Sequence, residues 1–84
     1  MFLEITSAKY LGDYRIEAIF NNGIVKEIDL ANHLTGKVFK PLKDKKLFRQ
    51  FEIQFNTICW NSGADFAPEF LFEIGNEIKK KKVA

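Results

Sequence analysis

The chain has 84 residues, which is enough for one domain and too few for two. Its composition, with 46% hydrophobic and 29% charged residues, five Gly and two Pro, excludes a disordered chain, a collagen-like repeat and a coiled coil. The net charge of +2 depends on four lysines at 79–82, because the remaining nine basic residues are outnumbered by eleven acidic ones, which leaves residues 1–78 at −2. We therefore expect a single domain over residues 1–78 and a basic tail over residues 79–84.

The sequence also bounds the cellular compartment. Cys59 is the single cysteine, so no disulfide can form within the chain. The N-terminus has no basic segment followed by an apolar run of signal-peptide length, and no stretch approaches the roughly 20 apolar residues of a membrane span. We expect a cytoplasmic protein with no membrane partner.

Strands dominate the first third of the chain. Apolar and polar residues alternate weakly over 3–8 and clearly over 14–20, and Gly12-Asp13 marks a turn between them. Asn22-Gly23 predicts a hairpin turn of type I′, since both residues tolerate positive φ, and the chain then returns over 24–30. On the strand over 14–20 we expect one face made of Tyr14, Ile16, Ala18 and Phe20, and the other of Arg15, Glu17 and Ile19.

Two short helical segments are expected next, over 29–36 with Asp29 as its N-cap and over 44–51 with Asp44 as its N-cap.

A second hairpin is expected after them. Apolar residues alternate over 51–55, a turn follows at Asn56-Thr57, and the chain returns over 58–60. Residues 64–66 form a further short extended piece.

The final helix is expected to begin at Pro68 and to run to Ile78. Asp65 is the candidate N-cap, and Gly75 weakens the helix by about 1 kcal/mol relative to Ala. One face of this helix is apolar, with Ala67, Leu71, Ile74 and Ile78, and the opposite face carries Glu69, Glu73 and Glu77. Together the elements predict an α+β fold, a small antiparallel sheet from two hairpins plus an N-terminal strand, with short helices and a C-terminal helix packed on one face.

Several motifs occur in a distinctive order. They are Asp13-Tyr14, Phe20-x-Asn22-Gly23, Ile28-Asp29-Leu30, Gly36-x-Val38-Phe39-x-x-Leu42-x-Asp44-x-x-x-Phe48, and Trp60-Asn61-x-Gly63-Ala64-Asp65-Phe66-x-Pro68-Glu69-x-Leu71. In this order the chain resembles the prokaryotic family catalogued as domain of unknown function 2442, over roughly residues 3–73. It departs from the family in having Phe66 where Leu is usual, and in its lysine tail.

The resemblance implies a small α+β domain that is mostly stand-alone. Some members resemble the N-terminal half of proteins that continue into a helix-turn-helix, which implies a sensing or partner-binding role. Stand-alone members are often encoded beside another small family, an arrangement that looks like a toxin–antitoxin pair. The family has no established catalytic residues, so none is carried over to this chain.

Residues suited to chemistry are scarce. His33 and Cys59 are the only histidine and the only thiol, and an exposed histidine and an inert buried thiol explain them better than a catalytic pair. Metal-ligand spacing such as C-x-x-C or H-x-x-x-H is absent from the sequence. We expect no enzyme activity, no metal and no cofactor.

Charge is distributed unevenly along the chain. Residues 37–49, the basic segment, hold six basic residues (among them Lys43, Lys46 and Arg49) against Asp44, and residues 50–78 hold five acidic residues and no basic one. A solvated loop with an apolar underside, an acidic protein partner and nucleic acid are three alternatives for the basic segment. The charge polarity suits a two-fold homodimer and equally suits neutralisation within one chain.

Two aromatic residues are further candidates. Phe72 lies about 140° around the final helix from the apolar stripe, so it is expected to point away from the core as a partner site. Trp60, with Asn61 and Asp65 near it in sequence, is either a core anchor or the floor of a small pocket.

The candidate surface therefore comprises Trp60, Asn61, Asp65, Phe72, Glu69, Glu73, Lys43, Lys46 and Arg49. The function that this sequence favours is a non-enzymatic module that binds a protein partner, the product of a neighbouring gene, or a second copy. A small-molecule sensor with a pocket near Trp60 is the alternative, and nucleic-acid binding through the basic segment is less favoured.

Overall fold

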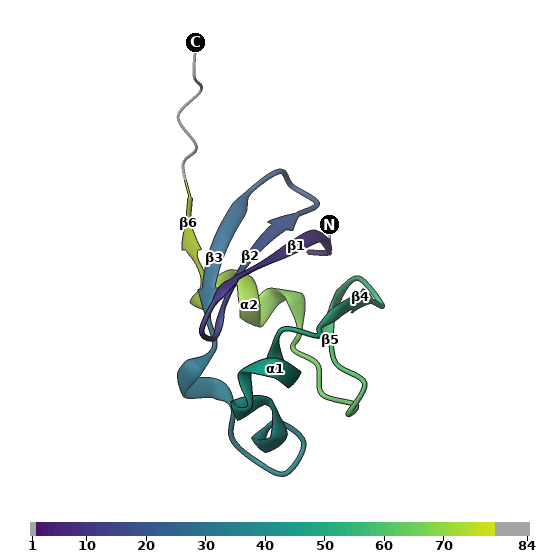
Figure 1. Ribbon diagram of the computed structural model, residues 1–84. Helices are drawn as coiled ribbons and strands as arrows, with labels where there is room; N and C mark the ends of the chain where they lie inside the picture. Colours follow the sequence, from purple (N-terminus) through teal and green to yellow (C-terminus); the bar gives the residue numbers. More distant parts are fainter. Residues whose placement is uncertain (1, 79–84) are drawn as a thin grey trace.

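Four antiparallel strands form the main sheet of the structure, a computed structural model that describes residues 2–78 (Figure 1). The strands follow the order β1 (Ile5–Gly12), β2 (Arg15–Phe20), β3 (Val25–Asp29) and β6 (Asn76–Glu77). Strands β4 (Glu52–Gln54) and β5 (Thr57–Cys59) form a separate two-stranded hairpin. The predicted α+β fold is thus confirmed, and the predicted basic tail over 79–84 lies outside the described residues.

Strand β2 carries the sheet's buried face. Its apolar residues Ile16, Ala18 and Phe20 are at most 1% exposed, as their alternation predicts. On the opposite face, the Arg15 guanidinium Nη1 lies 3.6 Å from the Glu27 carboxylate Oε2 on the neighbouring strand. The core therefore lies on one side of the sheet.

The turn between β2 and β3 is not the predicted type I′ turn. The loop has three residues, Asn21 to Gly23, and only Gly23 has positive φ, at +85°. Side-chain hydrogen bonds explain the difference, because Asn22 Oδ1 accepts from the Ile24 N–H at 3.0 Å and Asn21 Oδ1 accepts from the Glu4 N–H at 3.1 Å. These bonds hold both asparagines at negative φ.

The type I′ geometry instead occurs in the β4–β5 hairpin. Its two loop residues are Phe55 and Asn56, with φ values of +53° and +64°. The hairpin is confirmed, and its turn lies one residue before the predicted Asn56-Thr57.

Both predicted short helical segments are present and are shorter than expected. The first contains the 3₁₀ turn η1 (Ala31–His33), where Asp29 Oδ1 accepts from the Ala31 N–H at 3.0 Å. The 3₁₀ turn η2 (Lys40–Lys43) then leads into α1 (Lys45–Phe48), and Asp44 Oδ1 caps α1 by accepting from the Lys46 N–H at 2.9 Å. Asp44 is therefore the N-cap of α1 as predicted, whereas the prediction that Asp29 is an N-cap is wrong, because the N-cap of η1 is Leu30 and Asp29 forms a local turn before it.

The final helix, α2 (Pro68–Ile74), begins where Pro68 predicts and ends four residues before the predicted Ile78. Gly75 ends it, because a Cβ there would lie 3.0 Å from Ile28 Cγ1, Lys26 Cβ and the Leu71 carbonyl oxygen. Because Gly75 lies close to Ile28 and Lys26 of β3, the chain that follows it is extended and pairs with β3 as strand β6. Glu77 consequently lies opposite Lys26 in the sheet, and the expected stripe of three glutamates on one helix is wrong.

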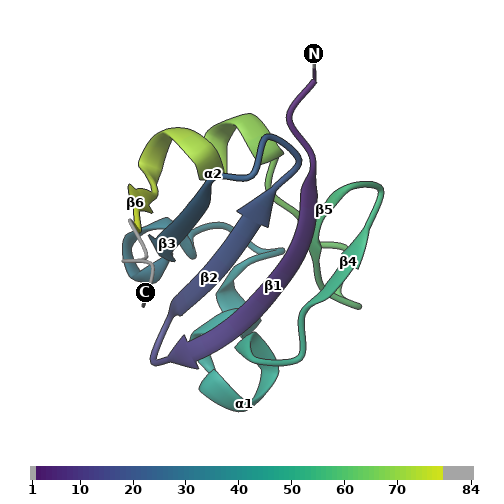
Figure 2. The same ribbon diagram turned by 90° about the horizontal axis from the view of Figure 1, so that it is seen from above.

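The helices cover the two ends of the same face of the sheet. The Phe48 ring of α1 packs edge-on against Tyr14 at 5.3 Å, and the Phe72 ring of α2 packs edge-on against Phe20 at 5.0 Å. Figure 2 accordingly shows α1 and α2 at opposite ends of the sheet, with the β4–β5 hairpin beyond β1. Within residues 2–78, the helices lack the length and apolar character that crossing a bilayer requires.

Candidate functional site

A small hollow opens beside Trp60, between the basic segment and the turn that follows β5. Its volume is about 80 Å³. Leu42 and Leu47 supply apolar walls from η2 and α1, and Gln50, Asn61 and Ser62 supply polar groups. We call this feature the Trp60 hollow, lined by Pro41, Leu42, Leu47, Gln50, Trp60, Asn61 and Ser62.

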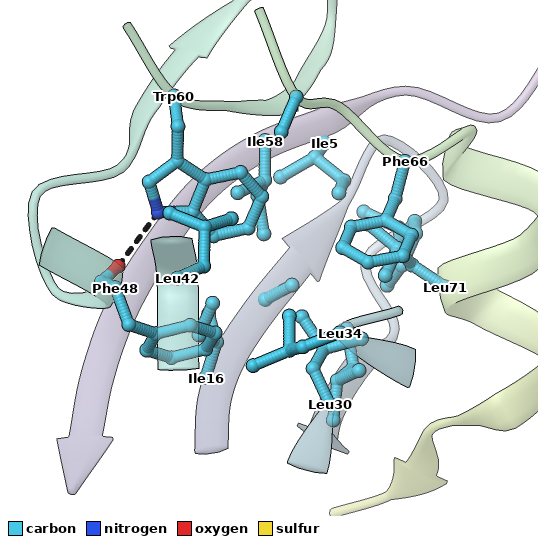
Figure 3. Close-up of a cluster of buried hydrophobic side chains, with 14 residues drawn as sticks. Ile5, Ile16, Leu30, Leu34, Leu42, Phe48, Ile58, Trp60, Phe66 and Leu71 are labelled. Carbon is cyan, nitrogen blue, oxygen red and sulfur yellow. Dashed lines mark hydrogen bonds between the residues drawn. The ribbon is translucent and has the colours of Figure 1, made fainter. Parts of the chain in front are cut away.

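Trp60 is both a core residue and part of the hollow's lining. It is 5% exposed, and its indole Nε1 donates a hydrogen bond of 2.7 Å to the Phe48 carbonyl oxygen (Figure 3). Its ring lies 5.6 Å from the Phe48 ring and 6.0 Å from the Phe66 ring. Because the polar edge of the indole is satisfied inside the protein, the wall it offers to the hollow is apolar.

The Trp-Asn-x-Gly motif has a structural role as a turn. The Gly63 N–H donates to the Trp60 carbonyl oxygen at 3.0 Å, and the Trp60 N–H donates to the Ala64 carbonyl oxygen at 2.9 Å. Gly63 has φ +91°, which a side chain would strain. This turn holds Asn61 exposed at the rim of the hollow.

Asp65 is not the N-cap of α2, so that prediction is wrong. The N-cap is Ala67, and no side chain hydrogen-bonds to the helix start. Asp65 instead pairs with Cys59 in an isolated antiparallel bridge, which keeps the chain extended two residues before the helix. Its exposed carboxylate does not line the hollow.

The basic segment is fixed to the sheet from beneath. The Tyr14 hydroxyl donates to the Lys43 carbonyl oxygen, and the Lys45 ammonium lies 3.0 Å from Asp13 Oδ1. The hydrogen bond that Lys45 donates to Asp13, together with the positive charge of Lys45, holds the pKa of Asp13 below its usual 3.8. The same hydrogen bond and the negative charge of Asp13 raise the pKa of Lys45 above its usual 10.5. The Arg49 guanidinium lies 5.3 Å from the centre of the Tyr10 ring.

Several other lysines of the segment are exposed and without such partners. Within residues 2–78, Lys43 and Lys46 form no ion pair, and the Asp44 carboxylate between them is engaged as the cap of α1. In sequence, these two lysines lie between Leu42 and Leu47, each next to a residue that lines the hollow. The basic segment therefore combines two apolar residues of the hollow's lining with exposed lysines between them.

Phe72 does not point away from the core, contrary to the sequence-based expectation. It is half-buried, with its ring against Phe20 and the Lys26 ammonium 4.1 Å above its centre. The reason is that the short α2 crosses the end of the sheet, so that Phe72 contacts β2 while its neighbour Leu71 fills the core. Phe72 is thus covered by a cation and offers no open aromatic surface.

Glu69 and Glu73 are exposed on α2, and neither lines the hollow. Among the residues that the structure describes, neither forms an ion pair with the basic segment. Of the sequence-predicted candidates, only Trp60 and Asn61 line the hollow. Lys43 and Lys46 are adjacent in sequence to its lining residues, Arg49 lies over the Tyr10 ring, and Asp65, Phe72, Glu69 and Glu73 do not line it.

The two residues weighed for nucleophilic chemistry are both half-buried. The His33 ring packs edge-on against Phe70 at 5.3 Å, and Cys59 lies in β5. The prediction that His33 is exposed and the prediction that Cys59 is buried are therefore each only partly correct. Over residues 2–78, no three His, Cys, Asp or Glu side chains gather as a metal site would require.

Sequence reasoning missed Leu47 and Gln50 as residues of the site. The helix expected over 44–51 would place Leu47 with Phe48 on its packed side. Because α1 has only four residues, Phe48 alone is fully buried, and Leu47 stays 43% exposed at the hollow. The sequence held a signal for this, because Leu47 and Phe48 are consecutive apolar residues and a single helical turn directs only one of them to the core.

The fold and this site define a small α+β domain with an antiparallel sheet, helices on one face and a small hollow between the basic segment and the turn after β5. The chain belongs to the family described as "Protein of unknown function (DUF2442)", whose model matches residues 5–77. The resemblance carried by the sequence motifs is thereby confirmed. No curated protein and no solved structure matches the chain.

Proposed function

We propose that the chain is a non-enzymatic binding module whose Trp60 hollow receives an apolar side chain of an acidic protein partner. The family resemblance supports the finer proposal that the partner is the product of a neighbouring gene, in a pairing of toxin–antitoxin type. The observation that carries the proposal is the hollow itself, with its apolar walls and polar rim.

The size of the hollow favours a protein partner over a small molecule. Small-molecule sites usually enclose roughly 300–1,000 Å³. At about 80 Å³, the Trp60 hollow has space for one side chain of a larger surface. A partner side chain needs no more, because binding energy at protein interfaces concentrates in a few buried anchors.

The electrostatics favour an acidic partner. Lys43 and Lys46, each next in sequence to a residue of the lining, are exposed, and neither forms an ion pair within residues 2–78. Carboxylates on an approaching protein would meet these charges at the rim and speed association.

The residues that line the hollow support a non-enzymatic role. The lining contains no histidine, cysteine or carboxylate. Its one hydroxyl, that of Ser62, therefore has no base of these types in the lining to activate it as a nucleophile.

The test is the solution mass of the chain co-expressed with the product of its genomic neighbour. We expect a defined complex, and we expect Leu47→Asp to weaken it about tenfold or more by placing a charge in the hollow. The double variant Lys43→Glu, Lys46→Glu should weaken it further at low salt. Lys9→Glu, on the exposed side of β1, is the matched control and should leave the affinity unchanged.

Two results would overturn the proposal. The first is a chain that remains free of its neighbour's product. The second is a small molecule that raises the melting temperature of the wild type and not of Leu47→Asp, which would favour the sensing alternative. Binding to nucleic acid that disappears with salt would instead favour the third function.

A further inference from the structure

Strand β4 has an apolar face that this chain leaves uncovered. Phe51, Ile53 and Phe55 alternate with polar residues, a pattern typical of a half-buried strand. Only Phe51 is half-buried, whereas Ile53 is 38% and Phe55 89% exposed. Within residues 2–78, the one strand that pairs with β4 is β5, so its other edge is open (Figure 2).

Phe55 combines exposure with an unfavourable backbone. It has φ +53° in the type I′ turn, where Asn and Gly are the residues that fit. An aromatic residue there strains the backbone and, in this chain, packs against nothing that offsets the strain. The ring is therefore available for a contact outside the chain.

On the edge of β4 that does not pair with β5, the backbone N–H and C=O groups of one residue, Ile53, point outward. A two-residue loop closes on the hydrogen-bonded pair Gln54–Thr57, so the next pair, Ile53–Ile58, is a non-hydrogen-bonded one. The N–H and C=O of Ile53 consequently point away from β5. A strand placed antiparallel along this edge would pair with both groups.

We propose that β4 pairs with β4 of a second copy of this chain, antiparallel about a two-fold axis between the two Ile53 residues. The two Ile53 residues would exchange their N–H and C=O hydrogen bonds across the axis. The two hairpins would then form one continuous sheet in the order β5-β4-β4-β5.

The side chains of β4 are complementary to those of a second copy, which favours that copy as the occupant. In this register, Glu52 lies opposite Gln54 of the second copy, and no like charges meet. Gln54 Nε2 already donates to Glu52 Oε2 at 3.0 Å within one chain, so the same amide–carboxylate pairing is repeated across the axis. Phe55 lies opposite Phe51 of the second copy, which gives the exposed ring an aromatic partner.

The contact would also extend the existing core. Ile53 lies directly opposite Ile58, which is fully buried. Two Ile53 side chains meeting at the axis would continue that apolar layer from one copy to the other. Because the ladder is only three residues long, the dimer belongs with small, weak interfaces.

This inference stands apart from the proposed function. None of the residues that line the Trp60 hollow lies in β4, so either site can be altered without the other.

The test is sedimentation equilibrium of the full chain over about 10 µM to 1 mM, the range in which weak interfaces associate. We expect a monomer–dimer equilibrium in the wild type. Ile53→Lys and Ile53→Glu should each be monomeric, since either places like charges at the axis, and an equimolar mixture of the two should regain the dimer. Val38→Lys, at an exposed apolar residue outside β4, is the control and should dimerise as the wild type does.

Phe55→Asn tests the same contact without placing a charge in β4. Phe55→Asn suits the positive φ and removes the ring, so the monomer folds and the dimer should weaken about tenfold or more. A wild type that stays monomeric throughout the range overturns the proposal. So does undiminished dimerisation of Ile53→Lys or Phe55→Asn, or failure of the mixed charged variants to associate when each alone is folded.

Discussion

The indole of Trp60 and the carbonyl of Phe48 are joined by a buried hydrogen bond of 2.7 Å. Phe48 is the last residue of α1, and Trp60 follows β5, so this bond ties the basic segment to the second hairpin. It fixes one wall of the hollow relative to the other. The geometry of the candidate site thus depends on a contact between residues 12 positions apart in sequence.

Removing this bond should destabilise the whole domain. Trp60→Phe leaves the Phe48 carbonyl buried without its donor, at a cost of about 1–3 kcal/mol, plus the loss of packing area. For a domain of this size we expect the melting temperature to fall by roughly 4–8 °C for each kcal/mol. Thermal unfolding measures it, with Asn61→Ala at the exposed rim as the control. A Trp60→Phe protein as stable as the control would show that the bond contributes nothing.

Replacing Gly75 by alanine should lower the stability of the protein. Alanine normally stabilises a helix over glycine by about 1 kcal/mol. At Gly75 its Cβ would lie 3.0 Å from Ile28, Lys26 and a backbone oxygen, so we expect Gly75→Ala to destabilise by about 1–3 kcal/mol. Urea unfolding measures the change, with the exposed neighbour Asn76→Ala as the reference. Increased stability of Gly75→Ala would mean that α2 can continue through this position.

Replacing Phe55 should stabilise the monomer. Its φ of +53° costs an L-residue with a bulky side chain about 1–2 kcal/mol. Phe55→Gly relieves this strain, and Phe55→Ala removes the ring while retaining the strain. Measured at concentrations below dimer formation, unfolding free energies should therefore rise for Gly and not for Ala. An equal effect of both would attribute the change to the ring and not to the backbone.

The exposed pair of Asp13 and Lys45 should give stability that depends on pH and salt. The pKa of Asp13 is lowered in the folded protein, so its stabilisation is full above the usual 3.8 and is lost as the pH falls through the lower folded value. The pKa of Lys45 is raised, so its stabilisation is full below the usual 10.5 and is lost as the pH rises through the higher folded value.

Lys45→Met tests this pair. The melting-temperature difference from the wild type should be greatest between these two limits and should shrink in high salt, which screens exposed charges. Lys46→Met, the adjacent exposed lysine, should show no such pH profile. The idea fails if the two variants behave alike at every pH.

Several elements follow from residues close together in sequence. Asp44 caps α1, and Pro68 begins α2, both as expected. The alternation over β2 also places its buried and exposed faces correctly. These features are predictable because the donor, acceptor or periodic pattern lies within a few residues of the element it determines.

Other features could not be predicted because they depend on partners distant in the chain. Phe72 is covered because α2 crosses the end of the sheet, where Lys26 lies above its ring. The Trp60 hollow exists because α1 ends after one turn and leaves Leu47 exposed. No local pattern specifies either arrangement.

The sequence by itself determined the fold class, the family, the charge polarity and the Asp44 cap of α1, since each is a property of composition, motif order or near neighbours. The tertiary structure decided which candidate residues meet. It joined Trp60 to the basic segment, separated Asp65 and Phe72 from that site, and ended α2 at Gly75, where a Cβ would lie only 3.0 Å from Ile28. The physical reason is that long-range packing and hydrogen bonding determine the position and exposure of each side chain, whereas sequence patterns report chiefly on neighbours along the chain.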